Sequence, residues 1–79
     1  ILSANVKVSP GSAIGAATVG TGVTIDASVI GDGVLIDNGV VITESIIGDG
    51  VVIHEGAHIT RAFLGGAGVV IDANSRHFG

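Results

Sequence analysis

Two consecutive stretches of this chain repeat each other and decide its fold. Residues 30–46 read IGDGVLIDNGVVITESI, and residues 47–63 read IGDGVVIHEGAHITRAF, so the first stretch recurs in the second with a 17-residue period. Residues 64–74 restart the pattern with LGGAGVVIDAN, and residues 14–29 hold a version that is one residue shorter. Self-similarity at a fixed period indicates a repeat architecture, in which each unit packs against its neighbours in the chain.

A finer period of five or six residues, with one step of seven, runs inside each unit. It is marked by large aliphatic residues, namely Val8, Ile14, Val19, Ile25, Ile30, Ile36, Ile42, Ile47, Ile53, Ile59, Leu64 and Ile71. Two positions before each of these lies a small residue or Val: Val6, Ser12, Ala17, Val23, Ser28, Val34, Val40, Ser45, Val51, Ala57, Ala62 and Val69. Residues two apart on a strand face the same side, so each short unit offers one large and one small inward side chain. None of the charged residues falls on these positions.

Turn-forming residues follow the large aliphatic residues, as in Gly31-Asp32-Gly33 and Asp37-Asn38-Gly39. Glycine supplies the positive φ of a sharp corner, and Asp and Asn tolerate it. Three short strands and three corners return the chain to its starting side, one strand spacing of roughly 4.8 Å further along. The pattern therefore predicts a three-sided parallel coil. A helix is disfavoured by the frequent Gly, a β-sandwich by the short strands, and collagen by the irregular Gly spacing.

The composition supports strands and excludes several kinds of partner. Val and Ile far outnumber Leu, Gly occurs 14 times, and no Cys is present. The net charge of −4, with only three cationic side chains, excludes a basic nucleic-acid surface and a polybasic membrane patch. No apolar run approaches the roughly 18 residues of a membrane helix. We expect a cytoplasmic chain with no nucleic-acid or membrane partner, cut from a longer protein because it begins at Ile1.

The motif [Ile/Leu/Val]-Gly-x-Gly-Val-x-Ile, repeated in sixes, resembles the hexapeptide-repeat proteins. The resemblance covers residues 5–74 and implies an all-β fold, a left-handed parallel β-helix of about four triangular coils, each of roughly 17 residues. It implies one domain over residues 1–79, with the coils at about 5–74. Residues 75–79 break the pattern, and we expect them to form a C-terminal tail or a cap in which Phe78 folds over the last coil.

Two groups of enzymes share this fold, the sugar-1-phosphate nucleotidylyltransferases and the acyltransferases. One detail of the sequence favours the nucleotidylyltransferases. The five-residue steps end in Ser28-Val29-Ile30-Gly31 and Ser45-Ile46-Ile47-Gly48. Together with the 17-residue coil, they resemble the C-terminal domain of sugar-1-phosphate nucleotidylyltransferases of the glucose-1-phosphate and mannose-1-phosphate type. The resemblance implies a domain for oligomerisation and interdomain packing, partnered by its own N-terminal catalytic domain and by further copies. It implies that Mg²⁺ is bound by the parent enzyme, with no cofactor, metal or catalytic residue in this chain.

Two other classes stay open. The first is a fragment of a hexapeptide-repeat acyltransferase, with acyl-CoA held between neighbouring coils and His54 or His58 as the base. The second is a purely structural or engineered repeat. A three-histidine zinc site like that of the β-helical carbonic anhydrases is disfavoured, because the His spacings do not fit that family and the chain has no Gln.

His54 lies at a corner, where stacking of the coils would place it between Asp37 and Asp72. A proton shuttle or a weak metal site is one interpretation, and an exposed corner residue with carboxylate neighbours is the other. His58 precedes Ile59 and is expected to point outward. The Gly-Asp-Gly stretches are interpreted as corners and not as phosphate loops, because no helix follows them.

Apolar residues also occupy outward positions, just before the large aliphatic ones. Val29, Ile46 and Phe63 form one column, and Leu35, Val52 and Val70 form a second on the next face. A soluble monomer rarely exposes contiguous apolar stripes. We therefore expect these two faces to form a subunit or interdomain interface, and the more polar third face to meet solvent.

Overall fold

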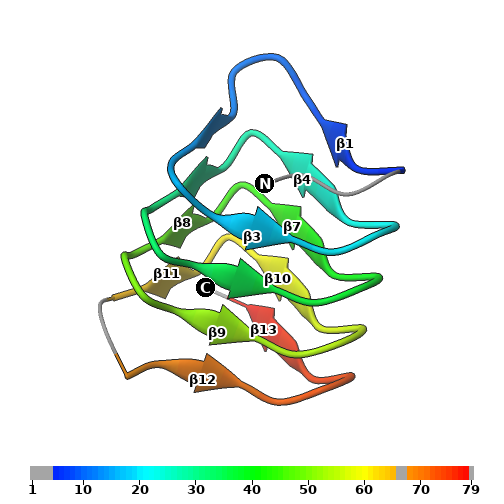
Figure 1. Ribbon diagram of the computed structural model, residues 1–79, viewed down its shortest axis with the longest axis vertical. Helices are drawn as coiled ribbons and strands as arrows, with labels where there is room; N and C mark the ends of the chain where they lie inside the picture. The colour runs from blue at the N-terminus through cyan, green and yellow to red at the C-terminus, as the bar shows by residue number, and fades with distance from the viewer. Residues whose placement is uncertain (1–4, 66–67, 79) are drawn as a thin grey trace.

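The computed structural model describes residues 5–65 and 68–78, and every regular element within them is a β-strand (Figure 1). The strands are short, and successive strands lie on different sides of a three-sided coil. No helix in these residues is long and apolar enough to cross a membrane.

Every third strand joins the same parallel sheet, which gives the coil three faces. The β7 face contains β1 (Lys7–Val8), β4 (Thr24–Asp26), β7 (Val41–Thr43), β10 (His58–Thr60) and β13 (Arg76–Phe78). The β8 face contains β2 (Ala13–Ile14), β5 (Val29–Ile30), β8 (Ile46–Ile47) and β11 (Phe63–Leu64). The β9 face contains β3 (Thr18–Val19), β6 (Leu35–Ile36), β9 (Val52–Ile53) and β12 (Val70–Ile71).

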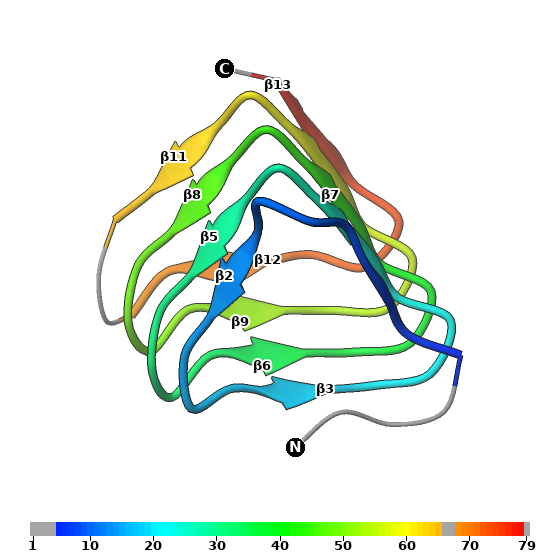
Figure 2. The same cartoon turned by 90° about the horizontal axis from the view of Figure 1, so that it is seen from above.

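The coil is left-handed, as the resemblance implied. Figure 2 looks down the axis from the N-terminal coil, and the chain turns counter-clockwise as it recedes from the viewer. The register follows the period of the sequence, with Val29 opposite Ile46 and Ile46 opposite Phe63. The predicted all-β, parallel, triangular coil is confirmed.

The interior is built from the predicted inward series. All buried hydrophobic residues belong to it, and Ile25, Ile42 and Ile59, which stack in register, are fully buried. At the N-terminal end of the coil the series becomes more accessible, and Val8 is 38% exposed. The core is therefore a single aliphatic column enclosed by three sheets, in which each layer is covered by the next.

The corners that precede β5 and β8 are held by a ladder of serine hydroxyls. Ser28 Oγ donates to the Asp26 carbonyl at 2.7 Å and accepts the Ser45 N–H at 3.0 Å. One coil later, Ser45 Oγ donates to the Thr43 carbonyl at 2.8 Å and accepts the Ala62 N–H at 3.1 Å. Among the described residues, no buried side-chain nitrogen or oxygen lacks a hydrogen-bond partner. Serine at this inward position is therefore a corner-forming residue as well as a small one.

The substitution Ser45→Ala is expected to destabilise the fold by about 1–3 kcal/mol, because the Ala62 N–H loses its acceptor at a buried corner. Urea unfolding followed by circular dichroism measures the loss. The matched control is Ala62→Ser, which adds a hydroxyl at the same corner of the next coil and should change the free energy of unfolding by less than about 1 kcal/mol. Equal unfolding midpoints for Ser45→Ala and the unmodified chain would contradict the role given to the ladder.

The expected tail or cap at residues 75–79 needs correction. Arg76–Phe78 form β13, which pairs with β10 and continues the β7 face. Phe78 is 72% exposed and does not cover the last coil. Asn74 makes the preceding corner, with φ of +57° at the position where Gly56 has +73° one coil earlier. Gly79 lies outside the described residues.

Candidate functional site

The β9 face carries a shallow apolar depression of about 340 Å³. Thr18, Leu35 and Val52 contribute outward side chains to it, and Asp37 and His54 lie at its rim. Leu35 is exposed and Val52 is half-buried, so the floor is apolar and open to solvent. Part of the predicted outward column of this face thus lies in a depression that has a histidine at its rim.

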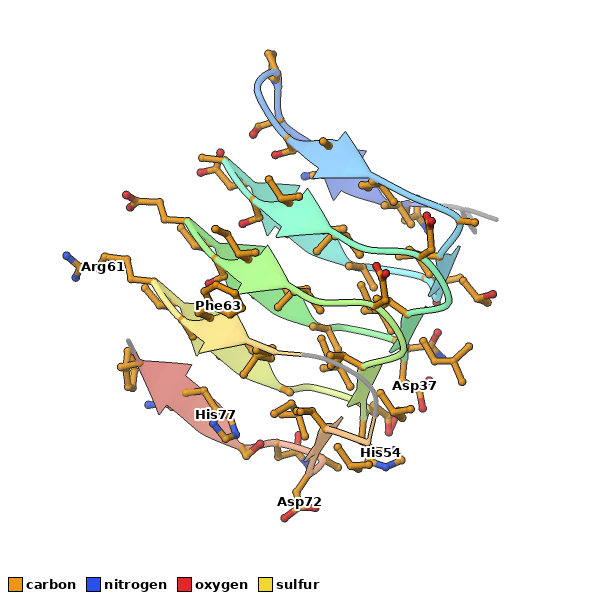
Figure 3. The ribbon with its side chains drawn as sticks, turned by 90° about the vertical axis from the view of Figure 1, so that its left-hand side faces the viewer. Asp37, His54, Arg61, Phe63, Asp72 and His77 are labelled. Carbon is orange, nitrogen blue, oxygen red and sulfur yellow. The ribbon has the colours of Figure 1, made fainter. Side chains whose placement is uncertain are left out.

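The β8 face presents a second apolar column. Val29, Ile46 and Phe63 stack in register and are between 47% and 74% exposed, with Phe63 the most exposed. Figure 3 shows Phe63 on the strand β11 of this face, clear of the core. The prediction that these side chains point outward is confirmed. The interface that we expect them to form stays a prediction.

Asp37, His54 and Asp72 form a column at one corner of the coil (Figure 3). The backbone places them in succession, because Asp37 N–H donates to the Ile53 carbonyl at 2.9 Å and His54 N–H donates to the Ile71 carbonyl at 3.0 Å. All three side chains are exposed. The Asp37 carboxylate accepts the N–H of Asn38 at 2.8 Å, so it takes part in its own turn. Within residues 5–65 and 68–78, no group of three His, Cys, Asp or Glu side chains is arranged to hold a metal ion.

The two candidate histidines are not brought together. His58 lies on the β7 face, with Val41 on one side and Arg76 on the other, and it is exposed. His54 lies at the rim of the β9 face. The two histidines could therefore not act together on one substrate within this chain. A base at His54 would act at the β9 face, and a base at His58 would act at the β7 face.

The Gly-Asp-Gly stretches are corners whose acidic side chains join neighbouring coils. Asp32 Oδ1 accepts the Ala16 N–H at 2.8 Å, and Asp49 Oδ1 accepts the Asp32 N–H at 2.8 Å. No helix follows either stretch in the described residues. These carboxylates cap backbone N–H groups of the preceding coil, which leaves no amide cradle open for a phosphate at these corners.

Two features of these surfaces were not foreseen from the sequence. The serine ladder was missed because Ser28 and Ser45 were counted only as small residues. The depression on the β9 face was missed because its shape depends on the sizes of side chains from three different coils. The signal that could have found the ladder is the recurrence of Ser at positions 12, 28 and 45, which lie at the same corner of successive coils.

The three parallel sheets of short strands define a left-handed parallel β-helix. Residues 27–61 match the family model described as bacterial transferase hexapeptide (six repeats). These residues extend from the corner before β5 to the end of β10 and its corner. Searches among curated proteins and among solved structures returned no match. These middle coils are thus similar to the hexapeptide repeats of bacterial transferases.

Proposed function

We propose that this chain is the C-terminal β-helix domain of a sugar-1-phosphate nucleotidylyltransferase, and that it joins subunits and domains without catalysing the transfer. The observation that carries the structural part of this proposal is the pair of adjoining apolar columns on the β8 and β9 faces. Their outermost side chains, Phe63 and Val70, are 74% and 53% exposed. Burial of such columns against another protein surface removes apolar area from water, which favours association.

The choice of enzyme class is supported by the construction of the short corner. Ala27, Glu44 and Arg61 have φ between +47° and +49°, and each precedes the inward Ser or Ala of a five-residue step. This corner gives the coil the 17-residue length that separates Ser28 from Ser45, and this length is the feature that resembles the nucleotidylyltransferase domains. In such an enzyme the Mg²⁺, the nucleoside triphosphate and the sugar phosphate would bind in a cytoplasmic catalytic domain outside this chain. We therefore assign none of them to residues described here.

A fragment of an acyl-CoA-dependent acyltransferase is the second candidate. The depression on the β9 face favours it, because an apolar floor beside the His54 imidazole could hold an acyl chain near a base once a second copy closed the site. An acyl-CoA should then raise the melting temperature of the chain, and Leu35→Asp, which places a charge in the apolar floor, should remove this shift. The nucleotidylyltransferase proposal expects no shift with an acyl-CoA.

The two classes separate in an assay of the natural protein that contains this chain. Our proposal expects pyrophosphate release from a nucleoside triphosphate and a sugar 1-phosphate in the presence of Mg²⁺. It also expects that His54→Ala and His58→Ala leave the rate per catalytic domain unchanged. Consumption of acyl-CoA without pyrophosphate release would overturn it in favour of the acyltransferase.

The two apolar columns provide a direct test of association. Ile46→Asp introduces a charge on the β8 face and Val52→Asp introduces one on the β9 face, so both together should dissociate the assembly by placing charges in an apolar contact. Light scattering coupled to size exclusion measures the mass. Thr24→Asp, on the more polar β7 face, is the control and should leave the mass unchanged. If the double variant has the same mass as the unmodified protein, the interface proposal is lost.

A further inference from the structure

The β9 face differs from the other two faces in the charges at its borders. One border is the corner that leads from the β8 face into the β9 face, and the other is the corner that leads from the β9 face to the β7 face. Asp32 and Asp49 lie at the first corner, and Asp37, Glu55 and Asp72 lie at the second. All five side chains are exposed. Five of the seven acidic residues of the chain therefore flank this one face.

The cationic side chains lie elsewhere on the coil. Lys7 and Arg76 are on the β7 face, and Arg61 is at the corner between the β7 and β8 faces, where Glu44 stands one coil before it. Within residues 5–65 and 68–78, neither border of the β9 face carries a Lys or an Arg, and His54 is the one basic side chain there (Figure 3). The β9 face is thus an apolar floor between two borders of negative charge.

This arrangement opposes contact between the β9 faces of two copies. In a two-fold contact the same patch of both copies meets, so the carboxylates of one copy would approach those of the other. Like charges brought together at an interface cost affinity. An anionic lipid surface would be repelled for the same reason. The occupant with complementary charge has an apolar centre and cationic groups on both sides of it.

The backbone of the β9 face limits the conformation of that occupant. β6 is paired with β3 and β9, and β9 is paired with β6 and β12, so both strands are paired on both sides. An extended peptide needs a free sheet edge if it is to add as a further strand, and β6 and β9 offer none. An α-helix satisfies its backbone hydrogen bonds internally and needs only side-chain contacts. The face therefore favours a helix.

The dimensions of the face suit a helix that lies along the coil axis. The outward column runs from Thr18 to Val70 over three strand spacings, roughly 14 Å. Two to three helical turns of about 5.4 Å cover this length. Asp32 and Asp37 lie on opposite borders and are five residues apart, hence at most about 18 Å from each other. A helix of about 10–12 Å in diameter fits between them, with its flanking cations near the carboxylates.

We propose that the β9 face binds an amphipathic helix whose apolar stripe is flanked on both sides by Lys or Arg. The stripe lies on Leu35 and Val52, over the depression of about 340 Å³, and the cations pair with the carboxylates of the two borders. The inference rests on the structural part of the proposed function, since it gives the chemistry of the surface that covers one of the two apolar columns. It does not depend on the enzyme class.

The test uses the 79-residue chain and two synthetic helical peptides that bear a fluorophore. Both carry the same stripe of leucines, which is flanked by lysines in one peptide and by glutamates in the other. Fluorescence anisotropy at low salt measures the two dissociation constants, and amide chemical shifts locate the contact. The lysine-flanked peptide should bind at least about tenfold more tightly, with the largest shifts at Leu35 and Val52. Equal affinities, no binding, or shifts centred on the β8 face would overturn the proposal.

Matched charge variants separate the two borders from the net charge of the chain. Asp37→Asn with Asp49→Asn removes one charge from each border and keeps the side-chain oxygens that accept backbone N–H groups. This pair should weaken binding of the lysine-flanked peptide by about three- to tenfold, the effect of two exposed ion pairs. Asp26→Asn with Glu44→Gln removes two charges away from the β9 face and should change the affinity by less than about twofold. Equal losses from the two pairs would overturn the proposal.

These outcomes are separate from those of the proposed function. If Ile46→Asp with Val52→Asp dissociates the assembly but the lysine-flanked peptide does not bind, the interface stands and the basic helix alone is overturned. Should the paired Asn variant fail to fold, Asp37→Asn alone has to weaken the binding of this peptide more than Glu44→Gln alone does.

Discussion

Replacement of Ile42 by Ala is expected to destabilise the chain by about 2–5 kcal/mol, because it removes a fully buried side chain from the middle of the aliphatic column. Ile42 stacks between Ile25 and Ile59, which are also fully buried, so two neighbouring layers lose contacts at once. A chain of 79 residues has a total stability of about 4–12 kcal/mol. The single substitution therefore removes a large share of it.

Circular dichroism in urea is the appropriate measurement, since the chain has no Trp or Tyr to report by fluorescence. Val41→Ala is the matched control. Val41 is the neighbour of Ile42 on the same strand and points outward, so its truncation should cost less than about 1 kcal/mol. An equal or larger loss at Val41 would mean that the inward and outward positions are exchanged.

Gly31→Ala is expected to cost at least about 1–3 kcal/mol, because a Cβ at this position meets the backbone of the next coil. That Cβ would collide with Asp49 Oδ1 and would lie 2.9 Å from the Asp49 nitrogen and 3.0 Å from the Gly48 carbonyl carbon. Asp49 Oδ1 also accepts the Asp32 N–H, so relief of the collision breaks a bond between coils. The two coils would have to separate locally to admit one methyl group.

The control is Gly22, where glycine suits the positive φ of the corner, whereas Gly31 is needed because the next coil approaches it closely. Gly22 has φ of +69°, and a Cβ there would meet nothing closer than 3.9 Å. Gly22→Asn should cost less than about 1 kcal/mol, since Asn74 adopts φ of +57° in this fold. Thermal and urea unfolding of the two variants compare the costs. A larger loss for Gly22→Asn than for Gly31→Ala would contradict the close approach of the coils.

The interior could be predicted from the sequence because the narrow column accepts only large aliphatic residues at one inward position and small residues or Val at the other. Every coil has the same two inward positions, so the buried Val and Ile residues can be recognised by their period. The stacking of His54 between Asp37 and Asp72 followed from the same register. A one-residue shift would have exchanged the inward and outward sides, so the pattern permits a single register.

The last strand, β13, could not be predicted from this period. It lacks both the inward aliphatic residue and the preceding corner glycine that identify the other strands of the β7 face. His77 occupies an inward position that is aliphatic in the preceding coils of the β7 face, and Asn74 replaces the corner glycine. Both exceptions occur at the end of the coil, where the inward residue is only partly covered. The sequence signal was present in the six-residue step from Ile71 to His77, with the small residue Ser75 two positions before it.

The candidate site was only partly predictable. Outward directions followed from the strand alternation, which is why the apolar columns on the β8 and β9 faces could be named in advance. The depression beside His54 depends on how Thr18, Leu35 and Val52 differ in size across three coils. The partner that covers either column is a property of a second surface, which the repeat pattern of this chain does not encode.

The central claim is that the chain winds as a parallel coil and does not fold back as hairpins, and a pair of double-cysteine variants tests it directly. The native chain has no Cys, so any disulfide arises from the introduced pair. In the coil, Val29 and Ile46 are outward neighbours in register, and Val29 and Leu35 lie on different faces. In a hairpin closed by Gly31-Asp32-Gly33, Val29 would instead lie opposite Leu35.

Strands stacked at roughly 4.8 Å place the α-carbons within the range of a disulfide. We predict that the variant Val29→Cys, Ile46→Cys forms an intramolecular disulfide on mild oxidation, seen by intact mass and faster migration in denaturing gels. The variant Val29→Cys, Leu35→Cys should stay reduced within the monomer. Ready closure between positions 29 and 35, without closure between 29 and 46, would contradict the coil and the inferences that depend on it.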